Sequence, residues 1–110
     1  MCGRYTLTDP EGVVAEFAPE ETDCDLGGPR HNISPTQKVP GILVRRSRSV
    51  LVHLQWGLVP AWSRDPSIGA KLINARAETL TQKPSFKYAF MRTRCLILAD
   101  GFYEWHKKPF

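Results

Sequence analysis

The stretch GILVRRSRSVLVHLQW, residues 41–56, predicts two antiparallel strands joined by a short basic turn. Aliphatic residues dominate both flanks of the RRSRS tip, and such residues are enriched in strands. In the second flank, apolar side chains recur at every other position from Val50 to Leu54. One face of this strand is therefore expected to be apolar, and the face that carries His53 is expected to be mixed. A sheet built on this hairpin is the expected centre of the fold.

The segment that precedes the hairpin predicts one short helix. Asp9 is a typical capping residue, and Pro10 suits the first helical position. Val13, Val14 and Phe17 would then lie on one face of the helix. The next part of the chain, up to the hairpin, is rich in Asp, Gly and Pro and predicts an irregular excursion over residues 20–36.

The remainder of the chain predicts mixed secondary structure. The expected elements are a loop over residues 57–71, an extended start turning helical over INARAETL (73–80), a helical turn over SFKYAFMR (85–92) and a hairpin over CLILADGFYEW (95–105) that turns at Asp100-Gly101. The expected fold class is α+β, a β-rich domain whose strands form a barrel-like core with short helices beside it.

Composition limits the classes of function. The 110 residues include 15 Lys or Arg and 11 Asp or Glu, which gives a formal charge of +4 and favours an anionic partner without naming one. Cys2, Cys24 and Cys95 are widely spaced and contain no C-x-x-C, so neither a disulfide framework nor a zinc ribbon is indicated. We expect no metal and no other cofactor. No apolar run or leader pattern indicates a membrane protein or a secreted one, so a cytoplasmic location is expected.

Cys2 stands directly after the initiator methionine. If Met1 is removed, Cys2 becomes the first residue and carries a free α-amine beside its thiol. An N-terminal amine and a thiol are both partly deprotonated near neutral pH. Such a residue presents two nucleophiles on adjacent carbon atoms.

Several separated motifs match one family in the same order along the chain. They are MCGRY (1–5), RHNISPTQ (30–37), WGLVPAW (56–62), INARAETL (73–80), KPSF (83–86), RCLILADGFYEW (94–105) and KKP (107–109). Together they resemble the SOS response-associated peptidase (SRAP) domain. The resemblance spans the whole chain and implies that residues 1–110 are the N-terminal part of a single SRAP domain of about twice this length.

The resemblance implies binding to abasic sites in single-stranded DNA and covalent attachment through Cys2. An abasic sugar opens to an aldehyde, which an amine converts to an imine. A neighbouring thiol can close this imine to a thiazolidine, and the closure is fast because it is intramolecular. The expected protein is a nucleoid-associated monomer with a lyase-like crosslinking activity, and the family name adds a thiol peptidase activity.

The resemblance also implies that Cys2, Asn74 and Glu104 are catalytic. Glu104 is expected in a strand beside an aromatic surface, where it could transfer protons. The alternative is that Glu104 is an ordinary exposed glutamate of a hairpin strand. Asn74 and Arg76 would point the same way from an extended segment. The amide could then orient the α-amine or the sugar, while the Arg76 guanidinium binds a phosphate.

Further DNA-binding residues are expected around Cys2. Arg4 could clamp a phosphate next to the reacting nucleotide. Trp56 and Trp62 could stack on bases, although Trp56 follows a strand and could instead belong to the core. Asn32 matches a family position near the site, but an Asn before Ser-Pro also forms turns. The arginines of residues 45–48 could bind DNA or simply be solvated.

Two other functions remain open. The first is a cysteine peptidase or N-terminal-nucleophile hydrolase, in which Cys2 attacks a carbonyl and can remove Met1 itself. The second is a non-covalent single-stranded DNA-binding module, for which Cys2 is dispensable and affinity falls with salt. The catalytic histidine of the family lies beyond Phe110, and His31, His53 and His106 do not stand in its motif.

Overall fold

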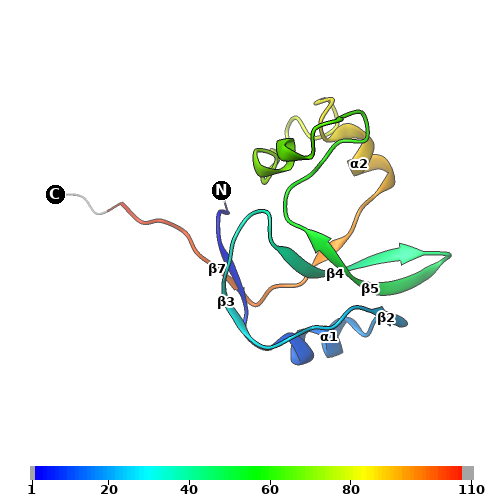
Figure 1. The fold of residues 1–110 in the computed structure, drawn as a ribbon, viewed down its shortest axis with the longest axis vertical. Coiled ribbons are helices and arrows are strands. Elements are labelled where there is room, and N and C mark those ends of the chain that lie inside the picture. The colour runs from blue at the N-terminus through cyan, green and yellow to red at the C-terminus, as the bar shows by residue number, and fades with distance from the viewer. Residues whose placement is uncertain (1, 108–110) are drawn as a thin grey trace.

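The computed structural model describes residues 2–107, and its strands form two small sheets (Figure 1). The three-stranded sheet has the order β3-β1-β7, and the four-stranded sheet has the order β2-β5-β4-β6. The elements are β1 (Tyr5–Leu7), α1 (Pro10–Phe17), β2 (Glu21–Asp23), β3 (Arg30–Ile33), β4 (Lys38–Arg45), β5 (Arg48–Gln55), the 3-10 helix η1 (Pro66–Ala70), α2 (Lys87–Arg92), β6 (Leu96–Ile97) and β7 (Gly101–Phe102). The α+β class is confirmed.

The predicted central hairpin is present. Strands β4 and β5 pair antiparallel over their whole length, from Lys38↔Gln55 to Arg45↔Arg48. The two residues between the strands both have positive φ, 53° and 64°, as a type I′ turn requires. The expected division into an apolar and a mixed face agrees with the structure: Val50 and Val52 are buried on one face, while the other face has a buried Leu51 beside an exposed His53. Other elements cover both faces of the sheet at this point.

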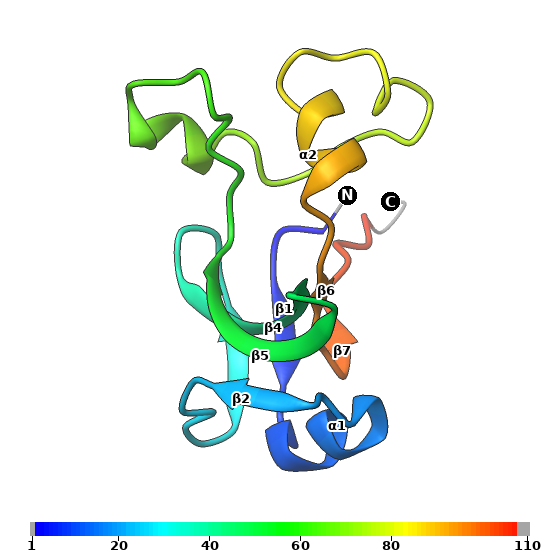
Figure 2. The same cartoon turned by 90° about the vertical axis from the view of Figure 1, so that its right-hand side faces the viewer.

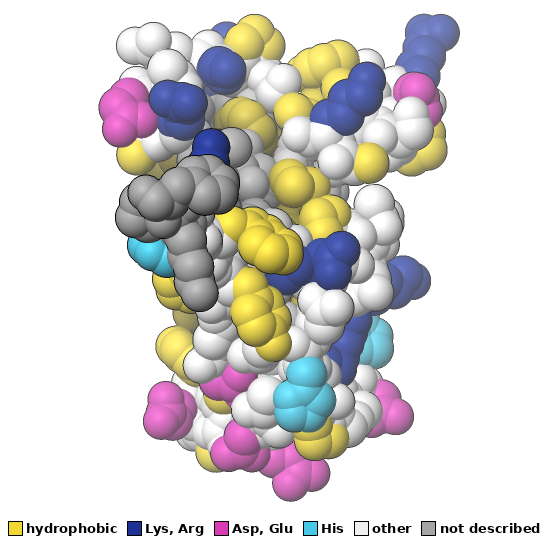
Figure 3. Space-filling model, turned by 90° about the vertical axis from the view of Figure 1, so that its left-hand side faces the viewer, with side chains coloured by type: hydrophobic (Ala, Val, Ile, Leu, Met, Phe, Trp, Pro, Cys, Tyr) yellow, Lys and Arg dark blue, Asp and Glu magenta, His cyan; other side chains and the backbone are white. Residues whose placement is uncertain are grey.

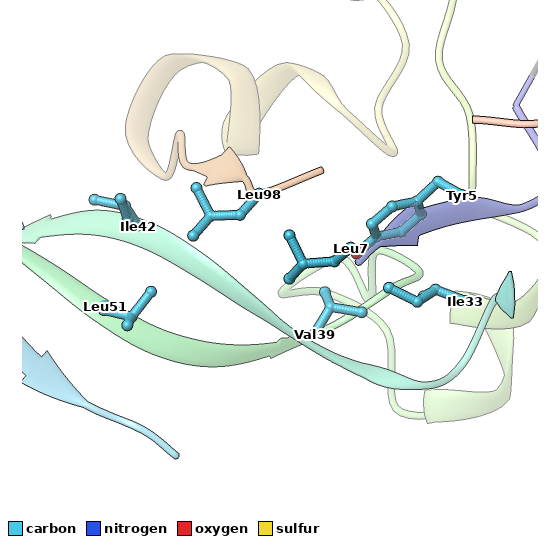
Figure 4. Close-up of a cluster of buried hydrophobic side chains, with 7 residues drawn as sticks. All are labelled: Tyr5, Leu7, Ile33, Val39, Ile42, Leu51 and Leu98. Atoms are coloured by element: carbon cyan, nitrogen blue, oxygen red, sulfur yellow. The ribbon is translucent and has the colours of Figure 1, made fainter. Parts of the chain in front are cut away.

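A cluster of buried hydrophobic side chains joins the two sheets (Figure 4). Leu98 lies in the chain between β6 and β7, and 1% of its surface is exposed. Burial of a leucine side chain stabilises a fold by about 1.5–3 kcal/mol. The buried members of this core are Tyr5, Leu7, Ile33, Val39, Ile42, Leu51 and Leu98.

The prediction of a hairpin that turns at Asp100-Gly101 is wrong. Strand β6 pairs with β4 in one sheet, and β7 pairs with β1 in the other. The Asp100 carboxylate binds the chain after β1, with Thr8 N and Asp9 N among its donors, instead of closing a local turn. Because β6 and β7 have two residues each and belong to different sheets, the strands of residues 2–107 form no closed barrel. Strand β7 also ends at Phe102, before the predicted strand position of Glu104.

The N-terminal part contains the predicted helix and three strands that were not predicted, β1, β2 and β3. Asp9 caps α1 by accepting a hydrogen bond from Gly12 N at 3.1 Å. Strands β2 and β3 occupy part of the expected irregular excursion over residues 20–36. Strand β2 pairs parallel to β5, and β3 pairs antiparallel to β1. Both are edge strands of three or four residues with mostly exposed side chains, so they lack the alternating apolar pattern that indicates a strand.

Residues 57–95, which connect β5 to β6, form a layer at one end of the molecule; α1 and β2 lie at the other end (Figures 1 and 2). We call this segment the η1–α2 layer. Its predicted loop contains η1, which Asp65 caps, and α2 confirms the predicted helical turn. INARAETL (73–80) forms neither a strand nor a helix: residues 73–76 lack regular secondary structure and residues 77–80 form turns. No helix within residues 2–107 combines the length and apolar character that crossing a membrane would need.

Candidate functional site

An open pocket of about 830 Å³ lies where the N-terminal segment meets both the η1–α2 layer and the chain between β6 and β7. Its surface is largely apolar, and Cys2 and Asn74 stand on its wall. Figure 3 shows one side of the molecule, with hydrophobic side chains gathered near its middle. The lining residues are Cys2, Tyr5, Gln55, Trp56, Gly57, Ile73, Asn74, Ile97, Ala99, Asp100, Gly101 and Phe102.

Cys2 and Asn74 meet in this pocket although 72 positions separate them in the chain. Asn74 Nδ2 donates a hydrogen bond to the carbonyl oxygen of Cys2 at 3.0 Å. Cys2 is half-buried and packs against the core, and its Sγ lies 3.5 Å from the carbonyl oxygen of Arg4. The amide of Asn74 therefore fixes the backbone of Cys2 against the η1–α2 layer. Met1, whose removal the sequence analysis expects, lies outside the described residues.

Arg4 and Asn32 also lie together, and the structure gives Asn32 a specific partner. Arg4, the residue before β1, donates from Nη1 to Oδ1 of Asn32 in β3 at 3.1 Å. The backbone of Arg4 accepts a hydrogen bond from Tyr103 N at 3.0 Å. The Tyr103 hydroxyl donates to the carbonyl oxygen of His31 at 2.7 Å. Asn32 therefore orients the exposed guanidinium of Arg4.

Glu104 lies next to this network. It follows Tyr103, and the hydrogen bond from Tyr103 N to Arg4 O extends the β1–β7 pairing by one residue. Glu104 thus comes directly after a residue that is hydrogen-bonded to the segment of Cys2 and Arg4. The expected aromatic surface around it is open, since 97% of the Trp105 side chain is exposed. Among the described residues, the pocket wall includes Phe102 but not Glu104.

The two predicted stacking tryptophans have different environments. Trp56 is half-buried, packs edge-on against Tyr5 with 5.4 Å between ring centroids, and donates from Nε1 to Ile73 O at 3.1 Å. It joins β5 to the η1–α2 layer and forms a wall of the pocket. Trp62 is 61% exposed, and its Nε1 donates to Pro84 O at 3.3 Å. Much of the Trp62 side chain is therefore accessible to solvent.

Charge is unevenly distributed along the molecule. The η1–α2 layer contains seven Lys or Arg, including Arg76, and two Asp or Glu; residues 9–25 contain seven Asp or Glu and no Lys or Arg. In Figure 3 most of the visible acidic side chains lie at the lower end, opposite the η1–α2 layer. Arg45 and Arg48 at the hairpin tip form exposed ion pairs with Asp23 and Glu21. These two arginines therefore pair with β2 in the structure, and a DNA-binding role for them stays a prediction.

Sequence reasoning missed two polar residues of the pocket. Asp100 accepts hydrogen bonds from the end of β1; its Asp-Gly dipeptide indicated only a local turn. Tyr5 is 6% exposed, and its hydroxyl has no hydrogen-bond partner among residues 2–107. Burial raises the pKa of Tyr5 to about 12, opposed by the nearby charge of Arg30. No pattern in the sequence distinguishes this tyrosine from an ordinary core residue.

The described residues offer no obvious metal site. Within residues 2–107, no three His, Cys, Asp or Glu side chains come together in a way that could hold a metal ion. Cys2, Cys24 and Cys95 are all free thiols. Burial raises the pKa of the Cys95 thiol, and burial together with two neighbouring aspartates raises that of Cys24.

Comparison with known proteins gives one consistent match. The family described as SOS response associated peptidase (SRAP) matches residues 1–110. The chain is 42% identical over 109 residues to the abasic site processing protein YoqW of Bacillus subtilis, covering 97% of this chain and 49% of that protein. It is 33% identical over 130 residues to the abasic site processing protein HMCES of Mus musculus, covering 97% of this chain and 37% of that protein.

A solved structure shares the fold. The crystal structure of a protein from Bordetella bronchiseptica superposes with a TM-score of 0.67 at 26% sequence identity. The match covers 94% of this chain and 50% of that one. The chain thus spans half or less of the length of the proteins that it matches here.

Proposed function

Because the chain belongs to the SRAP family, we propose that it carries the reacting residue of a protein that captures abasic sites in single-stranded DNA. The reacting residue is Cys2, which becomes covalently linked to the abasic sugar. The observation that carries this proposal is the hydrogen bond from Asn74 to the Cys2 carbonyl, which holds Cys2 at the wall of an open pocket. The names of YoqW and HMCES as abasic site processing proteins support the same substrate.

The proposed chemistry needs both nucleophiles of an N-terminal cysteine. After hydrolytic removal of Met1, the α-amine of Cys2 adds to the aldehyde carbon of the opened sugar, and loss of one water gives an imine. The thiol sulfur then adds to the imine carbon, and its proton passes to the nitrogen. The product is a five-membered thiazolidine, and one water is released overall. The second addition is fast because sulfur and imine belong to the same residue.

Neighbouring residues have defined roles in this proposal. Asn74 holds the Cys2 backbone, and Glu104 transfers protons during imine formation and ring closure. Arg4, oriented by Asn32, and Arg76 bind phosphates beside the abasic nucleotide. A single strand suits this site because unpaired bases can stack on an exposed ring such as Trp62.

The wider surface supports an anionic partner. The excess of Lys and Arg in the η1–α2 layer attracts phosphates. We further propose that the protein acts as a monomer on DNA in the cytoplasm or nucleoid, with no cofactor, since amine, thiol and aldehyde suffice for the chemistry.

The test uses the purified natural-length protein and a single-stranded oligonucleotide with one abasic site. We expect a band that survives denaturation, with a mass equal to protein plus DNA minus one water. Cys2→Ser keeps the α-amine and loses the thiol, so it should give a stable band only after borohydride reduces the imine. An oligonucleotide without the abasic site is the control and should give no band.

Other outcomes favour the alternatives. A stable band that persists in Cys2→Ala without reduction would identify a different nucleophile. Cleavage of a peptide or amide substrate that depends on Cys2, without any DNA adduct, would indicate a thiol peptidase. Equal and fully reversible binding of abasic and intact strands would indicate a non-covalent DNA-binding module.

A further inference from the structure

Strand β7 has only two residues. Its pairing with β1 nevertheless sets where the chain after β7, which contains Glu104, lies relative to the chain before β1, which contains Cys2. Its pairing with β1 consists of Tyr5↔Phe102 and Thr6↔Gly101. So short a ladder specifies its register weakly. A slip of one residue turns every side chain to the other face, and a slip of two moves the strand by about 7 Å.

Asp100 binds β1 and the residues after it at one end of this ladder. Its Oδ1 accepts a hydrogen bond from Thr6 Oγ1 at 2.7 Å. Its Oδ2 accepts from Thr8 N at 2.6 Å, Asp9 N at 2.9 Å and Thr8 Oγ1 at 3.1 Å. These hydrogen bonds lower the pKa of Asp100, and the one from Asp9 N has the largest effect. The carboxylate is therefore ionised at neutral pH, and hydrogen bonds to a charged acceptor are stronger than neutral ones.

Two further features hold the pairing of β1 with β7. Beyond the Phe102 end of the ladder, Tyr103 N donates a hydrogen bond to Arg4 O, and the Tyr103 hydroxyl donates one to His31 O in β3. Within the ladder, Gly101 allows a close approach, because a Cβ at this position would lie 2.8 Å from Thr6 Oγ1. The geometry leaves little room for another register as long as Asp100 keeps its partners.

We infer that Asp100 is a positioning residue for the crosslinking reaction. By binding Thr6, Thr8 and Asp9, it fixes the register of β1 against β7 and so sets where Glu104, two residues beyond β7, lies relative to the N-terminal segment of Cys2. Asp100 itself acts through β1 rather than on the DNA. This inference rests on the proposed function, because the register of β1 against β7 affects the reaction only if Cys2 and Glu104 take part in it.

The central experiment measures crosslinking by the natural-length protein with Asp100→Asn. The substitution keeps the size of the side chain but replaces one acceptor oxygen with an NH2 group that cannot accept from the backbone. We expect the first-order rate at saturating abasic DNA to fall about 10- to 100-fold, since a misplacement of about 1 Å can cost roughly a hundredfold. The affinity for an intact single strand should stay unchanged. The part of the rate–pH profile that depends on Glu104 should flatten, so that adding Glu104→Gln to Asp100→Asn slows the reaction little further.

A matched control is Asp65→Asn. Asp65 also accepts hydrogen bonds from a backbone N–H and a hydroxyl, both from Ser67, and they lower its pKa likewise. Its contacts are local to η1, so we expect the wild-type rate and pH profile. Equal slowing by Asp65→Asn and Asp100→Asn would overturn the inference. The effect would then follow from the loss of any aspartate that accepts backbone hydrogen bonds, and not from the position of Asp100.

A milder variant covers the case in which Asp100→Asn does not fold. Thr6→Val removes one hydrogen bond to Asp100 and keeps the branched shape of the side chain. We expect a slower reaction with the same changed pH profile. A folded Thr6→Val or Asp100→Asn protein with the wild-type rate and pH profile would overturn the inference.

The register can also be measured without any reaction. Nuclear Overhauser contacts between Tyr5 and Phe102 should weaken or shift in Asp100→Asn and persist in Asp65→Asn; unchanged contacts in both would overturn the inference. If the wild-type protein forms no adduct, the proposed function fails by itself. If the wild type forms the adduct and Asp100→Asn matches it, only the positioning role fails.

Discussion

The β4–β5 hairpin and the β1–β7 ladder are both antiparallel pairs, but different parts of the sequence hold them together. The hairpin extends from Lys38↔Gln55 to Arg45↔Arg48, and its strands adjoin in the chain. The β1–β7 ladder has two residue pairs, brought together by Asp100, which binds residues more than 90 positions away. The first pair depends on a local aliphatic pattern, whereas the second depends on polar contacts between distant segments.

The largest effect should come from removing a core side chain next to the short strands. Leu98→Ala deletes buried methyl groups where the two sheets meet, and we expect a loss of about 2–5 kcal/mol in the free energy of unfolding. Leu51→Ala, in the hairpin, is the matched variant and should cost a similar amount, because both leucines are 1% exposed. Urea denaturation measures both. A cost below about 1 kcal/mol for Leu98→Ala alone would mean that the short-strand region is not part of the core.

An intermediate effect is expected at the hairpin turn. Arg46 and Ser47 both have positive φ, a conformation that costs an ordinary L-residue about 1–2 kcal/mol. The double substitution Arg46→Asn/Ser47→Gly should therefore stabilise the protein by about 1 kcal/mol, since Asn-Gly prefers a type I′ turn. Thermal or urea unfolding checks the value. Ser47→Ala keeps the positive φ without glycine and serves as the control; equal stabilisation by the control would contradict the turn assignment.

The smallest effect is expected at the ion pairs of the hairpin tip. Arg48 Nη1 lies 3.4 Å from Glu21 Oε1, and both side chains are at least half exposed. Exposed ion pairs contribute little, so Arg48→Gln should change the free energy of unfolding by no more than about 0.5 kcal/mol. A double-mutant cycle with Glu21→Gln in low and moderate salt measures the coupling. A coupling well above 1 kcal/mol would show that β2 is held by this pair rather than by its ladder with β5.

Two aspartates show how much of the fold could be predicted. Asp9 caps the helix that starts at the next residue, so its role was visible in a short stretch of sequence. Asp100 precedes a glycine, which indicates a turn, but its partners lie at the start of the chain and cannot be found by local reasoning. Strands β2 and β3 were missed for a related reason, because exposed edge strands carry no alternating apolar pattern.

The candidate site was predictable only in part. The resemblance selected Cys2 and Asn74, and the structure joins them by a hydrogen bond. The resemblance also selected Asn32, and base stacking selected Trp56. The hydrogen bond between Asn32 and Arg4 and the packing of Trp56 against Tyr5 depend on tertiary structure and were not predicted. The catalytic role of Glu104 and the DNA contacts stay predictions.

The uneven charge of the η1–α2 layer and the opposite end has a consequence for the proposed encounter with DNA. A molecule with basic and acidic ends has an electric dipole, and the field of a polyanion exerts a torque on it. Such a molecule would arrive with its η1–α2 layer leading, before any short-range contact forms. At physiological salt this guidance reaches only about 8 Å, so the orientation would be selected in the last steps of diffusion.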